Sequence, residues 1–332
     1  MLNGNAEVDA AVRRSGFKTL ASVSEGTMRA SVVLLLVVLG ASAEAQPACN
    51  TTSEYKGTTE PVELRVLQSL KGTVALGGNT PCSAALVTFA GRSANSPALV
   101  LSAGHCSDHG KAEVTVGKKP LKMPDHDEVL YREGTRRSLT LETGKSDDPR
   151  ICMEADEIVY GTMRGADILL LRVSETYEQI EKRTGVTPFL LSRDTSFAPG
   201  LALGVPSAYW QNDRACQVEA TVDKVKEERW LWSPVLRIKV ADTCGFPHGA
   251  SGAPAIRKDS GEVIGAVGTA SDANAGACEL NNPCEVASDG SVKASTKEQG
   301  YVHFVHAFYT CLDKDRNVDL EIPGCQLPKP QR

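Results

Sequence analysis

The sequence is poor in aromatic residues and has no strong concentration of one charge. Aromatic side chains make up 5% of the 332 residues, whereas Gly, Ala, Val, Thr and Ser are plentiful. Helix bundles lean on Leu, Glu and Lys, so this mixture favours strands and turns. The formal net charge is −5 and no strong basic patch stands out, which argues against nucleic acid as a partner.

Several motifs of cofactor and metal chemistry are also missing. No CxxC pair occurs, so zinc-binding and thioredoxin-like chemistry lose their usual signature. Neither the GxGxxG pattern of dinucleotide-binding folds nor a P-loop is present, and no internal repeat is visible. The sequence therefore predicts no cofactor and no metal site.

The apolar run near the N-terminus is too short for a membrane span, which needs roughly 20 residues. Arg29 precedes Val32–Leu39, and small residues follow, so we predict a secretory signal peptide within residues 1–45. A buried core helix or an uncleaved anchor is the alternative. Residues 1–27 make an unusually long polar lead, which makes Met28 a second candidate start. We expect a secreted protein, extracellular or periplasmic, with no stable membrane association after cleavage.

The cysteines support export. There are ten of them, an even number, and none lies within the predicted signal segment. A set of disulfides formed in an oxidising compartment is the natural interpretation. Buried free thiols in a cytosolic protein are the alternative, which the signal segment disfavours.

Short apolar runs alternate with turn residues along most of the chain. About six candidate strands precede a connector at Ser174–Thr184 and about six follow it. The connector is expected to contain one or two helical turns that end near Gly185. Two-residue alternation at Leu236, Ile238 and Val240 fits half-buried antiparallel strands. This pattern predicts an all-β fold, either two β-barrels or a β-sandwich.

Composition divides the chain into segments. The stretch 118–148 is charged and poor in apolar residues, so we expect surface loops and a hairpin there. The predicted segments are a signal peptide with an N-terminal extension (1–45), a lead-in (46–61), an N-terminal β-barrel (62–185), a C-terminal β-barrel (186–312) and a polar tail (313–332).

Three short stretches carry residues suited to acyl transfer. His105 follows the apolar run Leu99–Leu101 after a turn of small residues, and a strand end is a stiff mount for a base. Asp167 directly precedes the apolar run Ile168–Leu171, and Ser251 lies in a glycine-rich turn. Taken alone, each has an ordinary explanation as a core or surface histidine, a turn aspartate or a Gly/Ser loop.

The turn around Ser251 has a backbone suited to oxyanion binding. Gly249 and Gly252 flank the serine just before a strand. Such a tight turn lets the N–H groups of Gly249 and Ser251 point to one spot, as the tetrahedral intermediate of acyl transfer requires. The stretch is not the GxSxG nucleophile elbow, because Ala253 stands where the second Gly is needed.

The three candidates are more informative together. His105, Asp167 and Ser251 follow one another at spacings of 62 and 84 residues. This is the His–Asp–Ser order of the chymotrypsin group, unlike the orders of subtilisins and α/β-hydrolases. The spacings fit two barrels with a cleft between them.

The same stretches resemble the trypsin/chymotrypsin superfamily of serine proteases. Ser102–Cys106, Asp167–Leu170 and Gly249–Pro254 are similar to its histidine, aspartate and serine motifs, within a resemblance that spans roughly residues 70–312. The chain resembles the bacterial and glutamyl-endopeptidase-like branches more than digestive trypsins. The resemblance implies two antiparallel β-barrels, a short C-terminal helix, and protein or peptide substrates.

The resemblance also implies a role for each residue. Ser251 is the expected nucleophile, His105 the general base and Asp167 the group that orients the base. Gly249 and Ser251 are the expected oxyanion donors. The implied activity is that of a secreted serine endopeptidase.

Some positions depart from the family pattern. Ala250 replaces the Asp that pairs with a new N-terminal amine in trypsin-type zymogens, so we do not expect activation by that salt bridge. Gly268 stands where many relatives have a Ser bonded to the catalytic Asp. Gly245 stands six residues before Ser251, where trypsins carry an Asp, so a preference for Arg or Lys by that route is not supported.

The expected substrate pocket includes Gly245, His248, Gly268 and Ala270. Ala270 stands where a pocket-lining Gly is common, which narrows the pocket. His248 is a candidate contact for an acidic substrate side chain, with a solvent-exposed loop histidine as the alternative.

The resemblance implies one disulfide, between Cys82 and Cys106. Cys311 and Cys325 are candidates for a second one that closes a local loop. Cys244 has two candidate partners, Cys278 and Cys216.

Three other functions compete with the endopeptidase. A catalytically silent homologue that binds a protein or glycan normally loses a triad member, and here all three are present. An esterase on another scaffold is disfavoured by the missing elbow and by the His-before-Ser order. A disulfide-rich structural protein would require the three motifs to arise by chance.

Overall fold

The computed structural model describes most of the chain after the predicted lead-in. The described residues are 68–78, 81–116, 119–147, 150–239, 244–271, 276–297 and 299–331. The predicted signal segment (1–45) and lead-in (46–61) lie outside them. Among the described residues, no helix combines the length and apolar character that a membrane span requires.

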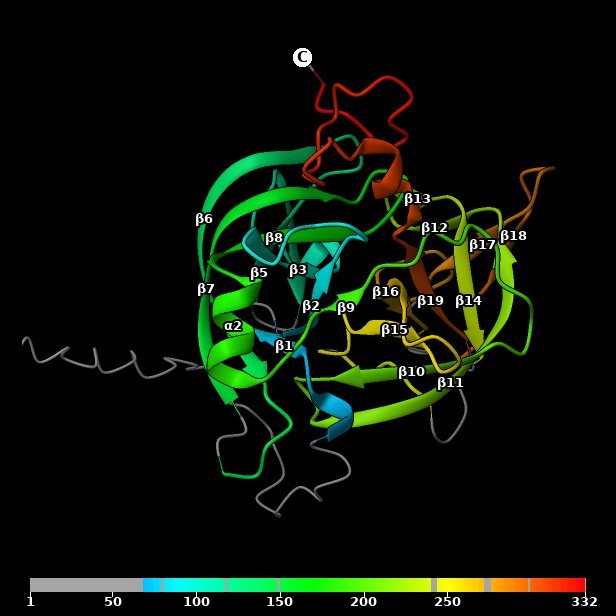
Figure 1. Cartoon of the computed structure of the whole chain (residues 1–332). Coiled ribbons are helices and arrows are strands. Elements are labelled where there is room, and N and C mark those ends of the chain that lie inside the picture. The colour runs from blue at the N-terminus through cyan, green and yellow to red at the C-terminus, as the bar shows by residue number, and fades with distance from the viewer. Residues whose placement is uncertain are drawn as a thin grey trace, which may run out of the picture. The chain divides into compact units, whose positions relative to one another are not determined.

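The first half of the described chain forms an antiparallel barrel of six strands, seen on the left in Figure 1. Around the barrel the strand order is β1, β6, β7, β8, β3, β2, and β2 pairs back with β1 to close it. A two-residue strand adds to β2 in parallel. The strands are β1 (Thr73–Leu76), β2 (Cys82–Thr88), β3 (Pro97–Ser102), β6 (Val129–Glu142), β7 (Arg150–Thr162), β8 (Ile168–Thr176) and the added β9 (Phe189–Leu190).

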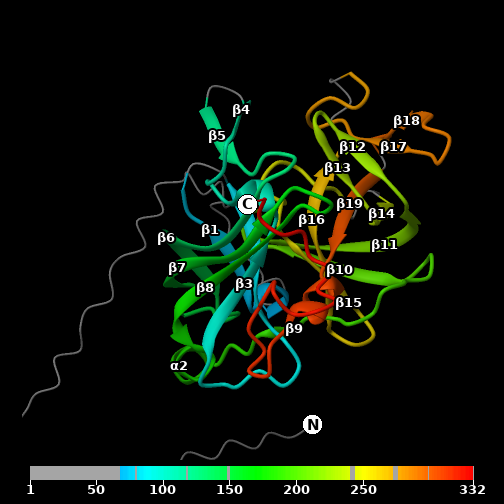
Figure 2. The same cartoon turned by 90° about the horizontal axis from the view of Figure 1, so that it is seen from above.

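The second half forms another closed antiparallel barrel, which lies beside the first in both views (Figures 1 and 2). Its order is β10, β11, β14, β19, β16, β15. The strands are β10 (Ala202–Ser207), β11 (Asn212–Val222), β14 (Val235–Lys239), β15 (Pro254–Arg257), β16 (Val263–Ala270) and β19 (Gln299–Phe304). Two closed antiparallel barrels confirm the predicted chymotrypsin-like fold class and exclude the sandwich.

Smaller elements surround the barrels. The helix α2 (Tyr177–Thr184) connects them, with a capping box at Thr176 and an αL residue, Gly185, at its end, as predicted. The 3-10 turn η1 (Gly104–Cys106) follows β3, and η2 (His306–Cys311) is the short C-terminal helix. The remaining strands are β4 (Ala112–Val116) paired with β5 (Lys119–Met123), and β13 (Trp230–Trp232), β12 (Val225–Glu227), β17 (Cys284–Val286) and β18 (Val292–Ala294) in one sheet.

The stretch 118–148, expected to form surface loops and a hairpin, contains the second strand of the β4–β5 hairpin and a long barrel strand. β6 runs for 14 residues and pairs with both β1 and β7. Leu139 and Leu141 at its end are buried in the first core. The middle of the strand is exposed and charged, and its pairing register shifts between Gly134 and Arg137. That interruption hides the two-residue period that marks a strand in a sequence.

Residues after the second barrel pack on the first one. The Phe308 ring of η2 lies 5.9 Å from the Phe89 ring and 5.7 Å from the Tyr160 ring. Further along, Val318 and Leu320 are buried in the same cluster. The segment 313–331 is therefore docked on the first barrel, although its composition is polar.

Four disulfides join described residues. Cys82–Cys106 is the pair that the resemblance implies, and Cys311–Cys325 closes the expected local loop. Cys244 pairs with Cys216, and Cys278 pairs with Cys284. Such a set is typical of proteins that fold outside the reducing cytosol.

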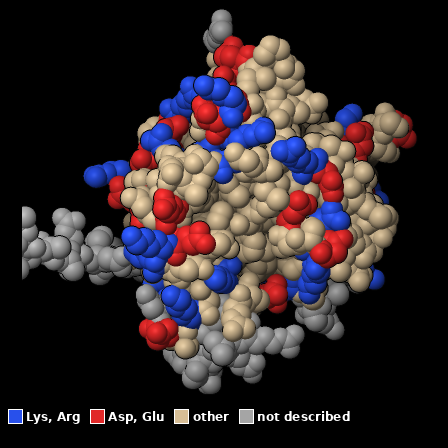
Figure 3. Space-filling model, viewed as in Figure 1, with Lys and Arg blue, Asp and Glu red and all other residues tan. Residues whose placement is uncertain are grey.

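Charged side chains are mixed over the visible surface. On the face in Figure 3, Lys and Arg lie among Asp and Glu around areas that carry neither.

Candidate active site

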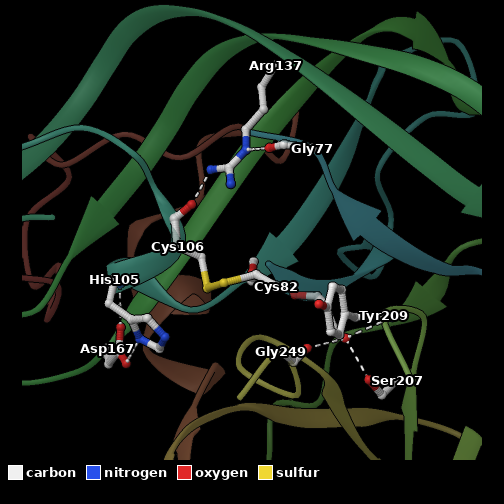
Figure 4. The surroundings of a disulfide bond; sticks show 11 residues. Gly77, Cys82, His105, Cys106, Arg137, Asp167, Ser207, Tyr209 and Gly249 are labelled. Atoms are coloured by element: carbon white, nitrogen blue, oxygen red, sulfur yellow. Dashed lines mark hydrogen bonds and ion pairs between the residues drawn. A yellow bond between two sulfur atoms is a disulfide. The ribbon is translucent and has the colours of Figure 1, made fainter. Parts of the chain in front are cut away.

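His105 and Asp167 are brought together by two paired strands of the first barrel. β3 ends at Ser102 and leads into η1, which carries His105, while Asp167 directly precedes β8, the antiparallel neighbour of β3. The Nδ1 atom of His105 lies 2.7 Å from Oδ2 of Asp167. The backbone N–H of His105 donates to Oδ1 of the same carboxylate at 2.9 Å. The aspartate therefore holds both the ring and the backbone of the histidine (Figure 4).

The two groups stabilise each other's charged form. Burial by itself lowers the pKa of His105, but the charge of Asp167 and the hydrogen bond to it outweigh burial and raise that pKa above 6.5. Burial by itself raises the pKa of Asp167, but His105 outweighs it and lowers that pKa. Asp167, only 1% exposed, is therefore ionised at neutral pH.

Ser251 lies where the two barrels meet. It precedes β15 of the second barrel, and its carbonyl oxygen accepts a hydrogen bond from the N–H of Ser83 on β2 at 2.8 Å. The next residue, Gly252, donates its N–H to the carbonyl of Val267 on β16 at 2.7 Å. A Cβ on Gly252 would lie 2.1 Å from Oγ of Ser102, so this close approach requires glycine.

All the predicted catalytic and pocket residues line one cavity of about 610 Å³. Its walls come from both barrels. Within the described residues, no hydrogen bond joins Oγ of Ser251 to His105, and such contacts are often long in structures without substrate. The predicted residues in the lining are His105, Asp167, Gly245, His248, Gly249, Ser251, Gly268 and Ala270.

The peptide groups before and after Gly249 are held in place by hydrogen bonds to their carbonyls. The carbonyl of His248 accepts from Nε1 of Trp210 at 3.0 Å, and the carbonyl of Gly249 accepts from Oγ of Ser83 at 2.9 Å. The carbonyl of Ala250 accepts from the N–H of residue 253 at 2.9 Å. In a trans peptide the N–H points opposite to the carbonyl. These bonds therefore fix the directions of the N–H groups of Gly249 and Ser251.

Those two N–H groups have no acceptor among the described residues. Gly249 and Ser251 both line the cavity. Gly249 has a φ of +97°, and a Cβ there would lie 2.3 Å from the Tyr209 ring, so both conformation and space require glycine. Two free donors beside a serine are suited to bind an oxyanion.

A disulfide and a buried arginine hold the turn that carries His105 (Figure 4). Cys106, the next residue, is bonded to Cys82 on β2. Arg137 of β6 donates to the carbonyls of Cys106 and Gly77. Burial lowers the pKa of Arg137 to about 10, so the guanidinium still carries its charge at neutral pH.

One cluster of potential metal ligands lies beside His105. Among the described residues, the group that brings three potential ligand atoms together consists of Cys82, His105 and Cys106. Both sulfur atoms belong to one disulfide and are therefore not available as thiolate ligands.

Two buried residues of the site were not foreseen from the sequence. Glu227 of β12 lines the cavity, is 4% exposed, and belongs to no motif. His303 of β19 is fully buried, and neither ring nitrogen has a hydrogen-bond partner among the described residues.

His303 fills the space beside Asp167 that a side chain at position 268 would need. A Cβ on Gly268 would lie 2.3 Å from Nε2 of His303 and 3.2 Å from Oδ2 of Asp167. The His303 ring also packs edge-on against Trp232, with ring centroids 5.0 Å apart. Burial lowers the pKa of His303 to about 4, so it is neutral at neutral pH. Gly268, which stands where many relatives of the resembled family have a Ser, leaves room for this imidazole.

The exposed position of His248 matches the alternative interpretation of that residue. His248 is exposed in the loop before Ser251. Its hydrogen bond with Trp210 is made by the carbonyl rather than by the ring.

Comparisons with known proteins find similarity at the level of structure. No family model and no curated protein sequence matches the chain. The MamO protease domain from Magnetospirillum magneticum is similar with a TM-score of 0.44 and 14% identity, over 74% of this chain and 98% of that one.

Two further solved structures are similar at the same level. The thermostable serine protease AL20 from an extremophilic microorganism has a TM-score of 0.42 and 16% identity, over 72% of this chain and 92% of that one. Human heparin binding protein has a TM-score of 0.41 and 12% identity, over 73% and 89%. The double barrel rests on the strand pairing of this chain rather than on these similarities.

Proposed function

We propose that this protein is a secreted serine endopeptidase that hydrolyses peptide bonds through an acyl-enzyme on Ser251. The observation that carries the proposal is the paired hydrogen bonding of Asp167 to the ring and backbone of His105. This pair shares one cavity with Ser251 and with two unpaired backbone N–H groups.

In the first half-reaction, Oγ of Ser251 attacks the carbonyl carbon of the substrate. Its proton passes to Nε2 of His105. This nitrogen can accept a proton because Nδ1 carries the ring hydrogen and donates it to Asp167. The C–N bond then breaks, and the same proton goes to the leaving amine. The products are a free amine and an ester on Ser251.

In the second half-reaction, water attacks this ester. His105 takes a proton from the water, and the ester C–O bond breaks. The proton returns to Oγ of Ser251, and the carboxylic acid product leaves. In both halves Asp167 stabilises the imidazolium, and the N–H groups of Gly249 and Ser251 bind the oxyanion.

Secretion is part of the proposal. The predicted signal segment supports it, and so do the four disulfides among the described residues. Ala250 is fully buried and offers no carboxylate to a new N-terminal amine, so a trypsin-type activating salt bridge is not part of the proposal.

A silent homologue that acts as a binding protein is the second candidate. The missing hydrogen bond between Ser251 and His105 is the observation that favours it. A disordered or misaligned nucleophile would give a protein with this fold and no turnover.

A covalent probe distinguishes the two candidates. The purified, oxidised protein is treated with a fluorophosphonate, and the labelled residue is located by peptide mass spectrometry. We expect labelling at Ser251, none in Ser251→Ala, and undiminished labelling in Ser260→Ala, which removes an exposed hydroxyl. Cleavage of an unfolded protein substrate, read as new N-termini, then separates a peptidase from an esterase. A folded wild type that resists the probe would favour the silent homologue.

A further inference from the structure

The carboxyl group of Glu227 lies in the wall of the cavity that contains Ser251 and His105. Glu227 is the last residue of β12, which pairs with β13 and β17. Its Oε1 accepts the N–H of Asn281 at 2.8 Å, and the nearby Thr269 side chain on β16 lowers its pKa. The bond from Asn281 anchors the carboxyl group in the cavity wall.

The second oxygen of this carboxyl group has no partner. Oε2 of Glu227 is buried without a hydrogen bond among the described residues. No Lys or Arg of the described chain forms an ion pair with it. Arg229 is close in sequence but pairs with Asp125 at 3.6 Å, and Lys297 of the cavity wall is exposed. A buried carboxyl group normally has a cation or a full set of donors.

The electrostatic surroundings leave this group able to change its charge. Burial raises the pKa of Glu227 to about 7, against the lowering effect of Thr269 and Asn281. His105 lowers that pKa and Asp167 raises it. A cation that entered the cavity would favour the ionised form and release a proton.

The rest of the wall near Glu227 suits an aliphatic stem. Two tryptophans and several other apolar residues line the same cavity. Lysine and arginine side chains join an apolar stem to a cationic head, and they bury the stem along apolar surfaces. Tryptophan faces also attract cations, and Arg229 already lies over the Trp230 ring, 5.7 Å from its centroid. The apolar residues are Met123, Met163, Trp230, Trp232 and Leu280.

We propose that Glu227 is a specificity-determining residue that receives a cationic side chain, Lys or Arg, of the substrate. The proposal rests on the proposed endopeptidase function. It places the acid on β12, away from the loop position of Gly245 where trypsins carry theirs. A preference for Lys or Arg thus arises from Glu227, although Gly245 offers no carboxylate.

Matched peptides test the selectivity. A position-scanning library first finds the position at which Lys and Arg are preferred, and two peptides with Arg or its neutral analogue citrulline there are then compared. We expect Glu227→Gln to reduce the Arg/citrulline ratio of kcat/KM by about 10- to 100-fold, the loss of one hydrogen-bonded charge pair. Glu228→Gln, the same change at the exposed neighbour, should leave the ratio unaltered.

The pH dependence of the same Arg/citrulline ratio is a second test. If Glu227 had only a structural role, this ratio would not change with pH. Titration of His105 affects both peptides, so its contribution largely cancels in the ratio. In the wild type the ratio should rise about tenfold from pH 6 to pH 8.5, because Glu227 ionises in this range. Glu227→Gln should lose most of this rise. A flat ratio in the wild type would overturn the proposal.

Binding of a small cation separates this proposal from the proposed catalysis. Ser251→Ala is titrated with n-butylguanidinium by calorimetry, with n-butylurea as the neutral control. We expect saturable binding of the cation only, lost in Ser251→Ala/Glu227→Gln. Binding without probe labelling of the wild type would keep the cation site and refute the peptidase. Probe labelling without cation binding or basic preference would refute the cation site alone.

Discussion

Asp167 and Glu227 are two buried carboxyl groups in one cavity, and their surroundings have opposite effects. Asp167 is 1% exposed and Glu227 is 4% exposed, so burial penalises the charge of both. Asp167 accepts two hydrogen bonds from His105 and its pKa is lowered. Glu227 has no cationic partner among the described residues and its pKa is raised to about 7. A partner, rather than burial, decides the charge of each group.

This difference fits the two roles that we propose for these carboxyl groups. An acid that orients a base must be ionised before substrate arrives, so its partner must belong to the protein. An acid that recognises a cation gains most when its partner arrives with the substrate. Where the surroundings give two carboxyl groups of one site very different pKa values, the two groups commonly have different roles.

Asp167→Asn should have the largest effect and would sharpen the contrast. We expect kcat to fall by about 10³- to 10⁴-fold, as when the aspartate of a Ser–His–Asp triad is replaced, because an amide cannot stabilise the imidazolium. Steady-state kinetics on a peptide without basic residues measures it. The same amide exchange in Glu227→Gln removes no hydrogen bond to His105 and should lower that kcat far less. A similar loss in Asp156→Asn, a partly exposed control, would argue against a specific role for Asp167.

Glu227→Gln should alter the dependence of stability on pH. The folded pKa of about 7 lies above the ordinary value of 4.5, so the folded state binds the proton more tightly. The free energy of unfolding therefore falls as pH rises from about 4.5 to 7 and stays lower above, by about 3 kcal/mol. Urea unfolding at pH 5 and pH 9, in a Ser251→Ala background, measures this loss. Parallel profiles with and without Glu227→Gln would show that the carboxyl group is not perturbed.

Gly268→Ala should have the smallest effect of the three and tests the space around Asp167. The added Cβ meets His303 and approaches Oδ2 of Asp167, so we expect kcat to fall by about 10- to 100-fold. A second substitution, His303→Ala, makes room and should restore most of the loss. Single and double variants are compared on one neutral peptide. Full activity of Gly268→Ala alone would show that His303 can move away without consequence.

The sequence predicted the parts of the site that lie in local motifs. His105, Asp167 and Ser251 each follow or precede a short apolar strand, and the structure places all three in one cavity. Their roles remain a proposal. The helix before Gly185 was predicted for the same reason, because the glycine that ends it is adjacent to it in the sequence.

Glu227 and His303 could not be predicted in this way, since their importance depends on distant pairing. Val225–Glu227 reads as the edge of a half-exposed strand, but Glu227 becomes buried because β12 pairs with β17, far along the chain. His303 lies in a strand whose neighbouring residues are buried on both faces. The one available signal was Gly268, whose missing side chain meant that something else had to fill the space beside Asp167.

The strand β6 shows the same limit for the fold. Its charged, exposed middle gives no strand period, and Arg137 at the register shift points inward to backbone carbonyls. Because arginine is rarely buried, a segment rich in charged residues is predicted to be a surface loop. Only the pairing with β1 and β7 makes the segment a strand.

The hydrogen bonds of Ser83 have a consequence for the time at which activity appears. Its N–H and hydroxyl, on the first barrel, bond to the carbonyls of Ser251 and Gly249 on the second. Contacts across the interface between the barrels therefore complete the hydrogen bonding of the loop that carries Ser251. During refolding, the strand signal in circular dichroism should recover before reactivity towards a fluorophosphonate does. On the proposed function, Ser251 becomes reactive only once the two barrels have docked, and unfolded copies of the chain are spared until then.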